Sequence, residues 1–184
     1  MDETLKKLAP NLLRSEADSR PVVVMMCGIA GAGKSTLSKA ILSTHPSFER
    51  LSIDTTIAAK HGIYAVDYPP EKSAEYQDEA ADECESRLVS LLAQGVKDVV
   101  VDMSFYSKDD RAHYRRLVEE HDGRCVLIYL RAASKEVLWQ RILQRRRNGI
   151  NADSAYEITE EIIDAYWSGF EAPVGEGEII IEVQ

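Results

Sequence analysis

Cysteine is scarce in this sequence: only three occur among 184 residues, and they are scattered rather than set at metal-ligand spacing. Cys27 and Cys125 fall within short apolar runs of the kind that form buried strands. Such cysteines behave as small apolar side chains, and a chain without a disulfide framework suits a reducing compartment. We therefore expect reduced, buried thiols and a cytoplasmic location.

Long apolar stretches are also missing. No run approaches the ~18 residues that a membrane-spanning helix needs, and residues 1–7 (MDETLKK) contain no apolar core of a signal peptide. Internal repeats and low-complexity tracts are absent as well. With 184 residues and 45% apolar composition, we expect one domain with a sizeable core and no membrane partner.

Positive charge is in deficit, because 22 Lys and Arg face 31 Asp and Glu, for a formal net charge of -9. Proteins that bind long nucleic acids usually present a basic surface, so this balance argues against such a partner. The base-reading motif N-K-x-D of GTPases is missing too, since Asn148 is followed by Gly-Ile-Asn. A GTPase is therefore disfavoured.

A phosphate-binding loop is present. The apolar run at residues 22–27 leads into G-I-A-G-A-G-K-S at residues 28–35, and a helix-like segment follows. The glycines let the backbone fold tightly round a phosphate chain with its N–H groups inward, while Lys34 contacts the β- and γ-phosphates and Ser35 can ligate Mg²⁺. We expect ATP to contact Gly28, Ala30, Gly31, Ala32, Gly33, Lys34, Ser35 and Thr36.

Strand-like and helix-like segments alternate along the chain, which is typical of an α/β domain with a mostly parallel, covered sheet. The predicted strands are 21–27, 51–54, 99–102, 125–130 and 179–181. The predicted helices are 2–14, 34–44, a short one ending near Lys60, 71–94, 108–121, 134–147 and 159–168. Residues 15–20 and 63–70 are expected to be linker and loop.

Two aspartates end predicted strands: Asp54 the second and Asp102 the third. Ligands of such sheets bind at the carboxyl ends of the strands, so both carboxylates should lie on the same edge as Gly28. There Asp102 could hold Mg²⁺, and Asp54 could orient or deprotonate an attacking hydroxyl. A turn or helix-cap role is the alternative for each.

Concentrated positive charge occurs only near Arg141 and Arg145, since residues 131–147 contain six bases and one acid. These two arginines lie one helical turn apart and could stack on a base or bind phosphate oxygens; the alternative is a surface helix end. Arg111 could contact an acceptor or pair with Asp110. Three tyrosines of the 55–75 region and its border could line an acceptor pocket or simply pack: Tyr64, Tyr68 and Tyr76.

The order of G-I-A-G-A-G-K-S-T, L-S-I-D, V-V-V-D-M-S-F-x-x-x-x-D-R, L-I-Y-L-R-A and R-I-L-Q-R-R-R resembles the small P-loop kinases. More narrowly, it is similar to the AAA-domain, zeta-toxin and polynucleotide-kinase-like group, over residues 21 to about 148. The resemblance implies a P-loop three-layer sandwich with a five-stranded parallel sheet in the order 2-3-1-4-5 and a short helical lid. Residues 21–184 would form this kinase-like domain, after an N-terminal helix and linker at 1–20.

The resemblance also implies roles for individual residues. Asp54 would contact or activate the acceptor hydroxyl, Asp102 would lie near the metal, and Arg141 and Arg145 would contact adenine and phosphates. Polynucleotide-type members often carry an arginine soon after the second strand, whereas Lys60 is the first base after Asp54 here. We therefore expect transfer from Mg·ATP to a hydroxyl of a small molecule.

The residues expected to be catalytic are Lys34, Asp54 and Arg145, with Arg111 as a further contact to the acceptor. Two alternatives stay open at this point. One is a 5′-hydroxyl polynucleotide kinase, and the other is a nucleotide-binding module with only slow ATP hydrolysis.

Overall fold

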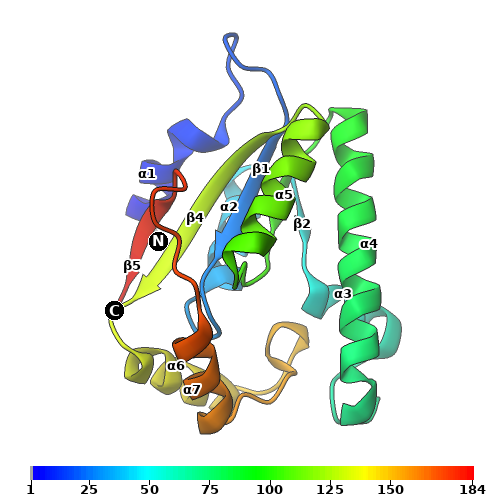
Figure 1. Ribbon diagram of the computed structural model, residues 1–184, viewed down its shortest axis with the longest axis vertical. Helices are drawn as coiled ribbons and strands as arrows, with labels where there is room; N and C mark the ends of the chain where they lie inside the picture. Colours follow the sequence, from blue (N-terminus) through cyan, green and yellow to red (C-terminus); the bar gives the residue numbers. More distant parts are fainter. Residues whose placement is uncertain (1) are drawn as a thin grey trace.

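A parallel β-sheet forms the centre of the molecule (Figure 1). The computed structural model describes residues 2–184, and within them the sheet has five strands: β1 (Val22–Cys27), β2 (Phe48–Leu51), β3 (Asp98–Val101), β4 (Arg124–Ala132) and β5 (Ile179–Val183). Their spatial order is β2-β3-β1-β4-β5, and all four pairings are parallel. The predicted strand order is confirmed.

Helices connect the strands and cover both faces of the sheet. They are α1 (Asp2–Leu12), α2 (Lys34–Thr44), α3 (Ile53–His61), α4 (Ser73–Gln94), α5 (Lys108–Glu120), α6 (Lys135–Arg147) and α7 (Glu160–Gly169), with short 3₁₀ turns η1 (Pro70–Lys72) and η2 (Ala152–Ser154). Figure 1 shows α4 and α5 on one side of the sheet and α6 and α7 below the carboxyl ends of the strands. None of the helices within residues 2–184 is long and apolar enough to span a membrane.

The three-layer arrangement follows from the burial of β1, all of whose residues are buried. Side chains alternate between the faces of a strand, so the even-numbered residues of Val22–Cys27 join one apolar cluster and the odd-numbered residues join another. Helices α1, α2, α6 and α7 contribute to the first cluster, and α4 and α5 to the second. The α/β three-layer sandwich is therefore confirmed.

The N-terminal helix packs against the body of the protein. Leu8 and Leu12 are fully or almost fully buried in the same apolar cluster as the even face of β1. Beyond the helix, Arg14 Nε donates to a carboxylate oxygen of Asp98 at 2.8 Å, and the same oxygen accepts the N–H of Val22 at 2.8 Å. Arg14 thus links the segment after α1 to the starts of β1 and β3.

The structure corrects the prediction for the second strand. Residues 51–54 were expected to form it, but β2 ends at Leu51 and Ser52 caps α3, accepting the Thr55 N–H at 3.4 Å. Asp54 therefore lies in the first turn of a helix, one of the positions that favours a carboxylate. The L-S-I-D segment is apolar enough to resemble a strand end, and the capping serine is the signal that distinguishes the two.

The apolar spacing of residues 71–94 predicts a buried stripe of Ala74, Gln77, Ala81, Cys84, Leu88, Leu91 and Leu92, but Ala74 and Gln77 are exposed and Ala81 is only half-buried. The buried face of α4 includes Ala80 rather than Ala81, together with Cys84, Leu88, Leu91 and Leu92. The sequence does not separate two adjacent alanines, because either can be accommodated at the edge of a helical apolar stripe.

Candidate active site

The phosphate-binding loop joins β1 to α2 and forms a tight turn. Gly31 and Gly33 have φ values of 84° and 100°, which side chains rarely permit. A Cβ on Gly31 would also lie 2.8 Å from the carbonyl oxygen of Leu138 in α6, so this glycine is needed for close packing as well. Gly33 precedes α2 without any side-chain cap, which leaves the first N–H groups of that helix for a ligand.

Lys34 is the first residue of α2, and its ammonium group donates to the carbonyl oxygen of Ile29 at 3.2 Å across the loop. Burial lowers the pKa of this lysine, while the charges of Asp102 and Asp54 oppose that change. A buried cation of this kind gains most from an added anion. The loop thus presents one positive charge and a row of N–H groups to a phosphate.

A cavity of about 600 Å³ opens beside this loop, at the carboxyl ends of the central strands. It brings together four of the predicted catalytic and metal-binding side chains: Lys34, Asp54, Asp102 and Arg145. Its other walls come from segments far apart in the sequence and include Ile29, Ala30, Gly31, Gly33, Ser35, Thr36, Ile53, Gln77, Met103, Ser104, Tyr106, Asp153, Ser154, Tyr156, Ile158, Ala165 and Tyr166.

Asp54 is exposed to the solvent in the cavity, but protein atoms crowd round its carboxylate and partly desolvate it. This burial raises the pKa of Asp54, and the charges of Asp102 and Asp153 raise it further, while Lys34 lowers it. A carboxylate with a raised pKa is a better proton acceptor than an ordinary one. The group is therefore suited to orient or deprotonate a hydroxyl.

Asp102 directly follows β3, and its side chain is only 2% exposed. One of its oxygens accepts a hydrogen bond from Arg50 Nε at 2.8 Å and lies 2.6 Å from Nη2 of the same ion pair. Arg50 was not among the predicted site residues. Its position in β2, opposite Val100 and so diagonal to Asp102, follows only from the strand register.

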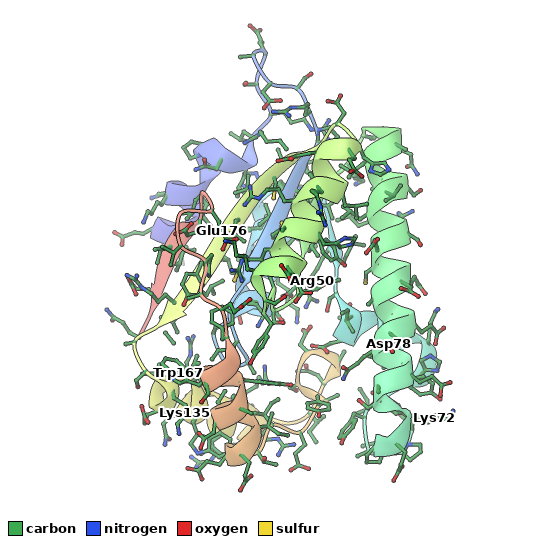
Figure 2. All side chains as sticks on the ribbon, in the orientation of Figure 1. Arg50, Lys72, Asp78, Lys135, Trp167 and Glu176 are labelled. Atoms are coloured by element: carbon green, nitrogen blue, oxygen red, sulfur yellow. The ribbon has the colours of Figure 1, made fainter. Side chains whose placement is uncertain are left out.

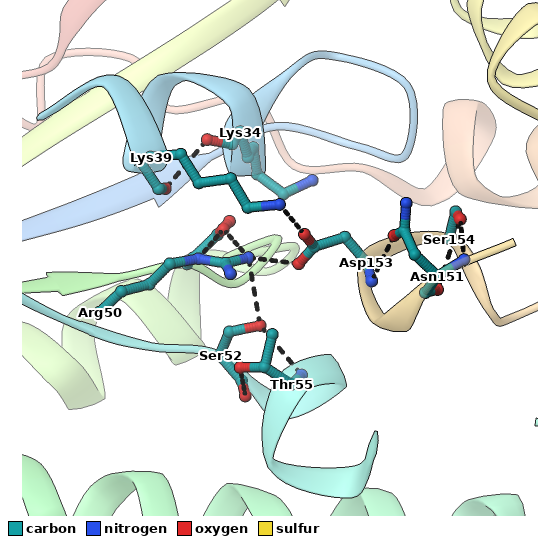
Figure 3. A network of polar contacts seen from close by, with 10 residues as sticks. Lys34, Lys39, Arg50, Ser52, Thr55, Asn151, Asp153 and Ser154 are labelled. Atoms are coloured by element: carbon teal, nitrogen blue, oxygen red, sulfur yellow. Dashed lines mark hydrogen bonds and ion pairs between the residues drawn. The ribbon is translucent and has the colours of Figure 1, made fainter. Parts of the chain in front are cut away.

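Arg50 also reaches the segment that follows α6. Its Nη2 lies 2.5 Å from a carboxylate oxygen of Asp153 in η2, and Lys39 of α2 pairs with the other oxygen (Figure 3). Burial would raise the pKa of Asp153, but the hydrogen bonds from Lys39 and Arg50 lower it overall. This network, made of Lys39, Arg50, Asp102 and Asp153, ties η2, which follows α6, to α2, β2 and the end of β3.

Replacing Arg50 with methionine is expected to reduce the free energy of unfolding by about 3 kcal/mol at neutral pH, because the buried Asp102 and the half-buried Asp153 lose their common partner. Arg50 lowers the pKa of Asp153 in the native protein, so this pair stabilises the fold while Asp153 is ionised. The contribution is lost as the pH falls through that lowered pKa, and the effect of the substitution should therefore shrink in acid. Urea unfolding at several pH values measures both effects. Arg87→Met is the matched control, since its pair with Glu49 lies on the surface and should leave the unfolding midpoint almost unchanged. Equal losses in the two variants would contradict a structural role for the buried network.

Arg141 and Arg145 of α6, the two arginines expected to contact the nucleotide, differ in their surroundings. Arg141 is exposed, with its Nη1 3.4 Å from the carbonyl oxygen of Ala32. The Nε of Arg145 is buried, and it has no hydrogen-bond partner among the described residues. Burial lowers the pKa of Arg145, although Asp54 and Asp153 oppose the change. Both arginines also line a smaller cavity of about 270 Å³ on the outer side of the loop, with Gly31, Gly33, Thr36, Gln144 and Asn148.

The structure corrects the prediction for Arg111, which does not line the cavity and pairs with Glu176 rather than with Asp110. Its side chain is 1% exposed, and it makes a bidentate ion pair with Glu176, with both distances 2.7–2.8 Å. The same guanidinium donates to the carbonyl oxygens of Phe105 and Glu171. Arg111 thus anchors the segment that leads to β5, through Glu176, which lies 65 positions further along the chain.

Of the two alternatives for Tyr64, Tyr68 and Tyr76, lining an acceptor pocket or packing, the structure shows packing. Tyr68 is buried beside Ile57 and Ala80, with Tyr64 and Tyr76 against the same small cluster. The tyrosines that line the main cavity come from the 103–111 region and from beyond α6: Tyr106, Tyr156 and Tyr166. No local sequence signal predicts Tyr156 or Tyr166 in the site, because the chain after α6 is brought to the cavity only by the tertiary fold.

The residues present fit a nucleoside triphosphate and its metal. The loop has positive φ values at its glycines, free N–H groups at the start of α2 and a half-buried lysine, and the unpartnered Nε of Arg145 needs an acceptor. Ser35 and Asp102 line the same cavity and offer the oxygen ligands that Mg²⁺ prefers. Fold and cradle together define a P-loop protein with the architecture of the small kinases.

The chain matches the family of AAA domains over residues 23–173, and it belongs to that family. The matched range begins within β1 and ends before β5, so it includes every residue of the cavity. No curated protein sequence gives a significant match.

Solved P-loop kinase structures share the fold. A candidate kinase from Chloroflexus aurantiacus J-10-fl is 20% identical, with a TM-score of 0.68 over 89% of this chain and 84% of that one. The Mycobacterium tuberculosis APS kinase CysC, solved with AMPPNP and APS, is 16% identical, with a TM-score of 0.58 over 89% and 88%. A chain of the Pnkp1/Rnl/Hen1 RNA repair complex is 18% identical, with a TM-score of 0.66, but only 44% of that longer chain is covered, against 82% of this one.

Proposed function

We propose that this protein transfers the γ-phosphoryl group of ATP to a hydroxyl group of a small-molecule acceptor. The observation that supports this most strongly is the meeting of Lys34, Asp54, Asp102 and Arg145 in one cavity beside the phosphate-binding loop. A binding module needs the loop and the lysine, whereas a transferase also needs a proton acceptor, and Asp54, a carboxylate with a raised pKa, lines the same cavity as that lysine.

Each residue has a distinct role in this proposal. Lys34 and Arg145 stabilise the negative charge that develops on the transferred phosphoryl oxygens. Ser35 and Asp102 hold Mg²⁺, which neutralises charge on the β- and γ-phosphates when bound. Asp54 accepts the hydroxyl proton while the acceptor oxygen bonds to phosphorus and the bond from phosphorus to ADP breaks. Arg141 contacts the nucleotide from the outer side of the loop.

A screen of metabolites for acceptor-stimulated ADP release with Mg·ATP tests the proposal. We expect at least one alcohol to raise ADP release well above the rate without acceptor, and the phosphorylated product to be detectable by mass spectrometry. Slow hydrolysis that no acceptor changes would favour a nucleotide-binding module instead. Labelled transfer to the 5′-hydroxyl of an oligonucleotide, but to no small molecule, would favour a polynucleotide kinase.

A further inference from the structure

Positive charge in the main cavity is confined to the nucleotide side. The cavity is lined by Lys34, which belongs to the loop, and by Arg145, which also lines the smaller cavity next to Gly31 and Gly33. Among the described residues that line the main cavity, no other lysine, arginine or histidine occurs. Both cations are needed for the phosphates of the nucleotide, so they are not available to an acceptor.

Two cations that flank the lining residues Ile53 and Asp54 in the sequence, Arg50 and Lys60, already have carboxylate partners. Arg50 pairs with Asp102 and Asp153, as described above. Lys60, the first base after Asp54, points to α4, where it pairs with Glu79 at 2.9 Å and with Glu83. A phosphate, sulfate or carboxylate on the acceptor would therefore find no free cation on this side.

The remaining wall is apolar, aromatic and acidic. Ile53 and Met103 contribute aliphatic surface, and Tyr106 and Tyr166 lie edge to face with their ring centroids 6.1 Å apart. The hydroxyl of Tyr106 donates to the carbonyl oxygen of Ala165 at 3.3 Å, which leaves its ring as the part available to a ligand. Three carboxylates line the cavity, and Asp102 and Asp153 are both paired with Arg50. Among the described residues, Asp54 is the lining carboxylate without an ion-pair partner.

Granted the phosphoryl transfer proposed above, we infer that the acceptor is an uncharged or cationic alcohol that carries an apolar ring. The ring packs against the tyrosine and aliphatic wall, and the hydroxyl meets Asp54. An anionic acceptor is excluded because its charge would approach Asp54 without a compensating cation in a site of reduced dielectric. Sugar phosphates and the first nucleotides of a 5′-hydroxyl oligonucleotide fall in the excluded class.

Three benzyl alcohols that differ only in their para substituent test this inference. They are 4-(aminomethyl)benzyl alcohol, 1,4-benzenedimethanol and 4-(hydroxymethyl)benzoate, and their affinities for the full chain saturated with Mg·AMPPNP can be measured by ligand-observed NMR. We expect the amine to bind about tenfold more tightly than the carboxylate, with the diol between them or equal to the amine. Tightest binding by the carboxylate, or binding by none of the three, would overturn the inference.

A pair of variants shows whether the charge of this wall sets the order. Gln77 of α4 lines the main cavity, whereas Gln144 of α6 lines only the smaller one. Gln77→Arg is expected to reverse the preference between carboxylate and amine, and Gln144→Arg, which adds the same charge on the nucleotide side, to leave it unchanged. An unchanged order in Gln77→Arg would contradict the inference.

The outcome is separable from that of the proposed function. If the protein binds no Mg·AMPPNP, the proposed function fails, and the order of the three probes on the nucleotide-free chain still tests the charge of the cavity. If an acceptor is phosphorylated but anionic compounds bind best, the transferase proposal stands and this inference fails.

Discussion

Lys34→Ala should lower acceptor phosphorylation by about 10³-fold, with the fold unchanged. A preorganised donor to the transferred group typically contributes a factor of about 10²–10³ in rate, and this lysine is the cation at the centre of the loop. Its loss should not destabilise the protein, because burial lowers the pKa of Lys34, so its charge is not a favourable term in the unliganded fold. Rates of ADP release and thermal unfolding midpoints are the measurements.

Lys39→Ala provides the matched control for this experiment. Lys39 lies on the same helix, but its ammonium group pairs with Asp153 and does not line the cavity. We expect it to keep most of the transfer rate. A rate in Lys34→Ala close to that of the unmodified protein would exclude the proposed phosphate contact.

Asp54→Asn should lower turnover by about 10²–10⁴-fold, the usual contribution of a general base, with little change in ATP affinity. The amide keeps the shape of the side chain but cannot accept the hydroxyl proton. Steady-state turnover and nucleotide titration separate the two effects. The control is Asp78→Asn, an exposed aspartate of α4 (Figure 2), which should change neither quantity. Nearly normal turnover in Asp54→Asn would rule out the base assignment.

The pH dependence of turnover gives a second readout for Asp54. Because burial and nearby carboxylates raise its pKa, the rate should increase with pH through a midpoint above the ordinary range of an aspartate. The charge of Asp153 is one of the causes that raise the pKa of Asp54, so Asp153→Asn should move the midpoint to lower pH. A midpoint that stays in place would argue that another group controls the acid limb.

Local patterns were sufficient to predict most of the fold. The loop motif, the boundaries of α2 and the alternation of strands with helices follow from short-range signals, and the parallel sheet follows from the continuous apolar runs of its central strands. The error at residues 51–54 arose where a short strand passes directly into a capped helix. There the apolar pattern is too short to distinguish the two-residue period of a strand from the 3.6-residue period of a helix.

The candidate site was predictable only where it depends on local motifs. Lys34, Asp54, Asp102 and Arg145 stand next to recognisable signals, and the structure brings all four into one cavity. The partner of Arg111 was missed because it depends on a contact across 65 residues. The same holds for Arg50 with Asp153, 103 residues apart, since composition and spacing carry no record of such distant pairs.

The central position of β1 also determines when the chain can fold. Its two neighbours, β3 and β4, begin at Asp98 and Arg124, so neither edge of β1 finds its partner until much of the polypeptide has been synthesised. Until then, a strand made only of buried apolar residues is exposed to chaperones and to self-association. Such distant pairing slows folding, and we expect refolding on the millisecond-to-second scale rather than in microseconds.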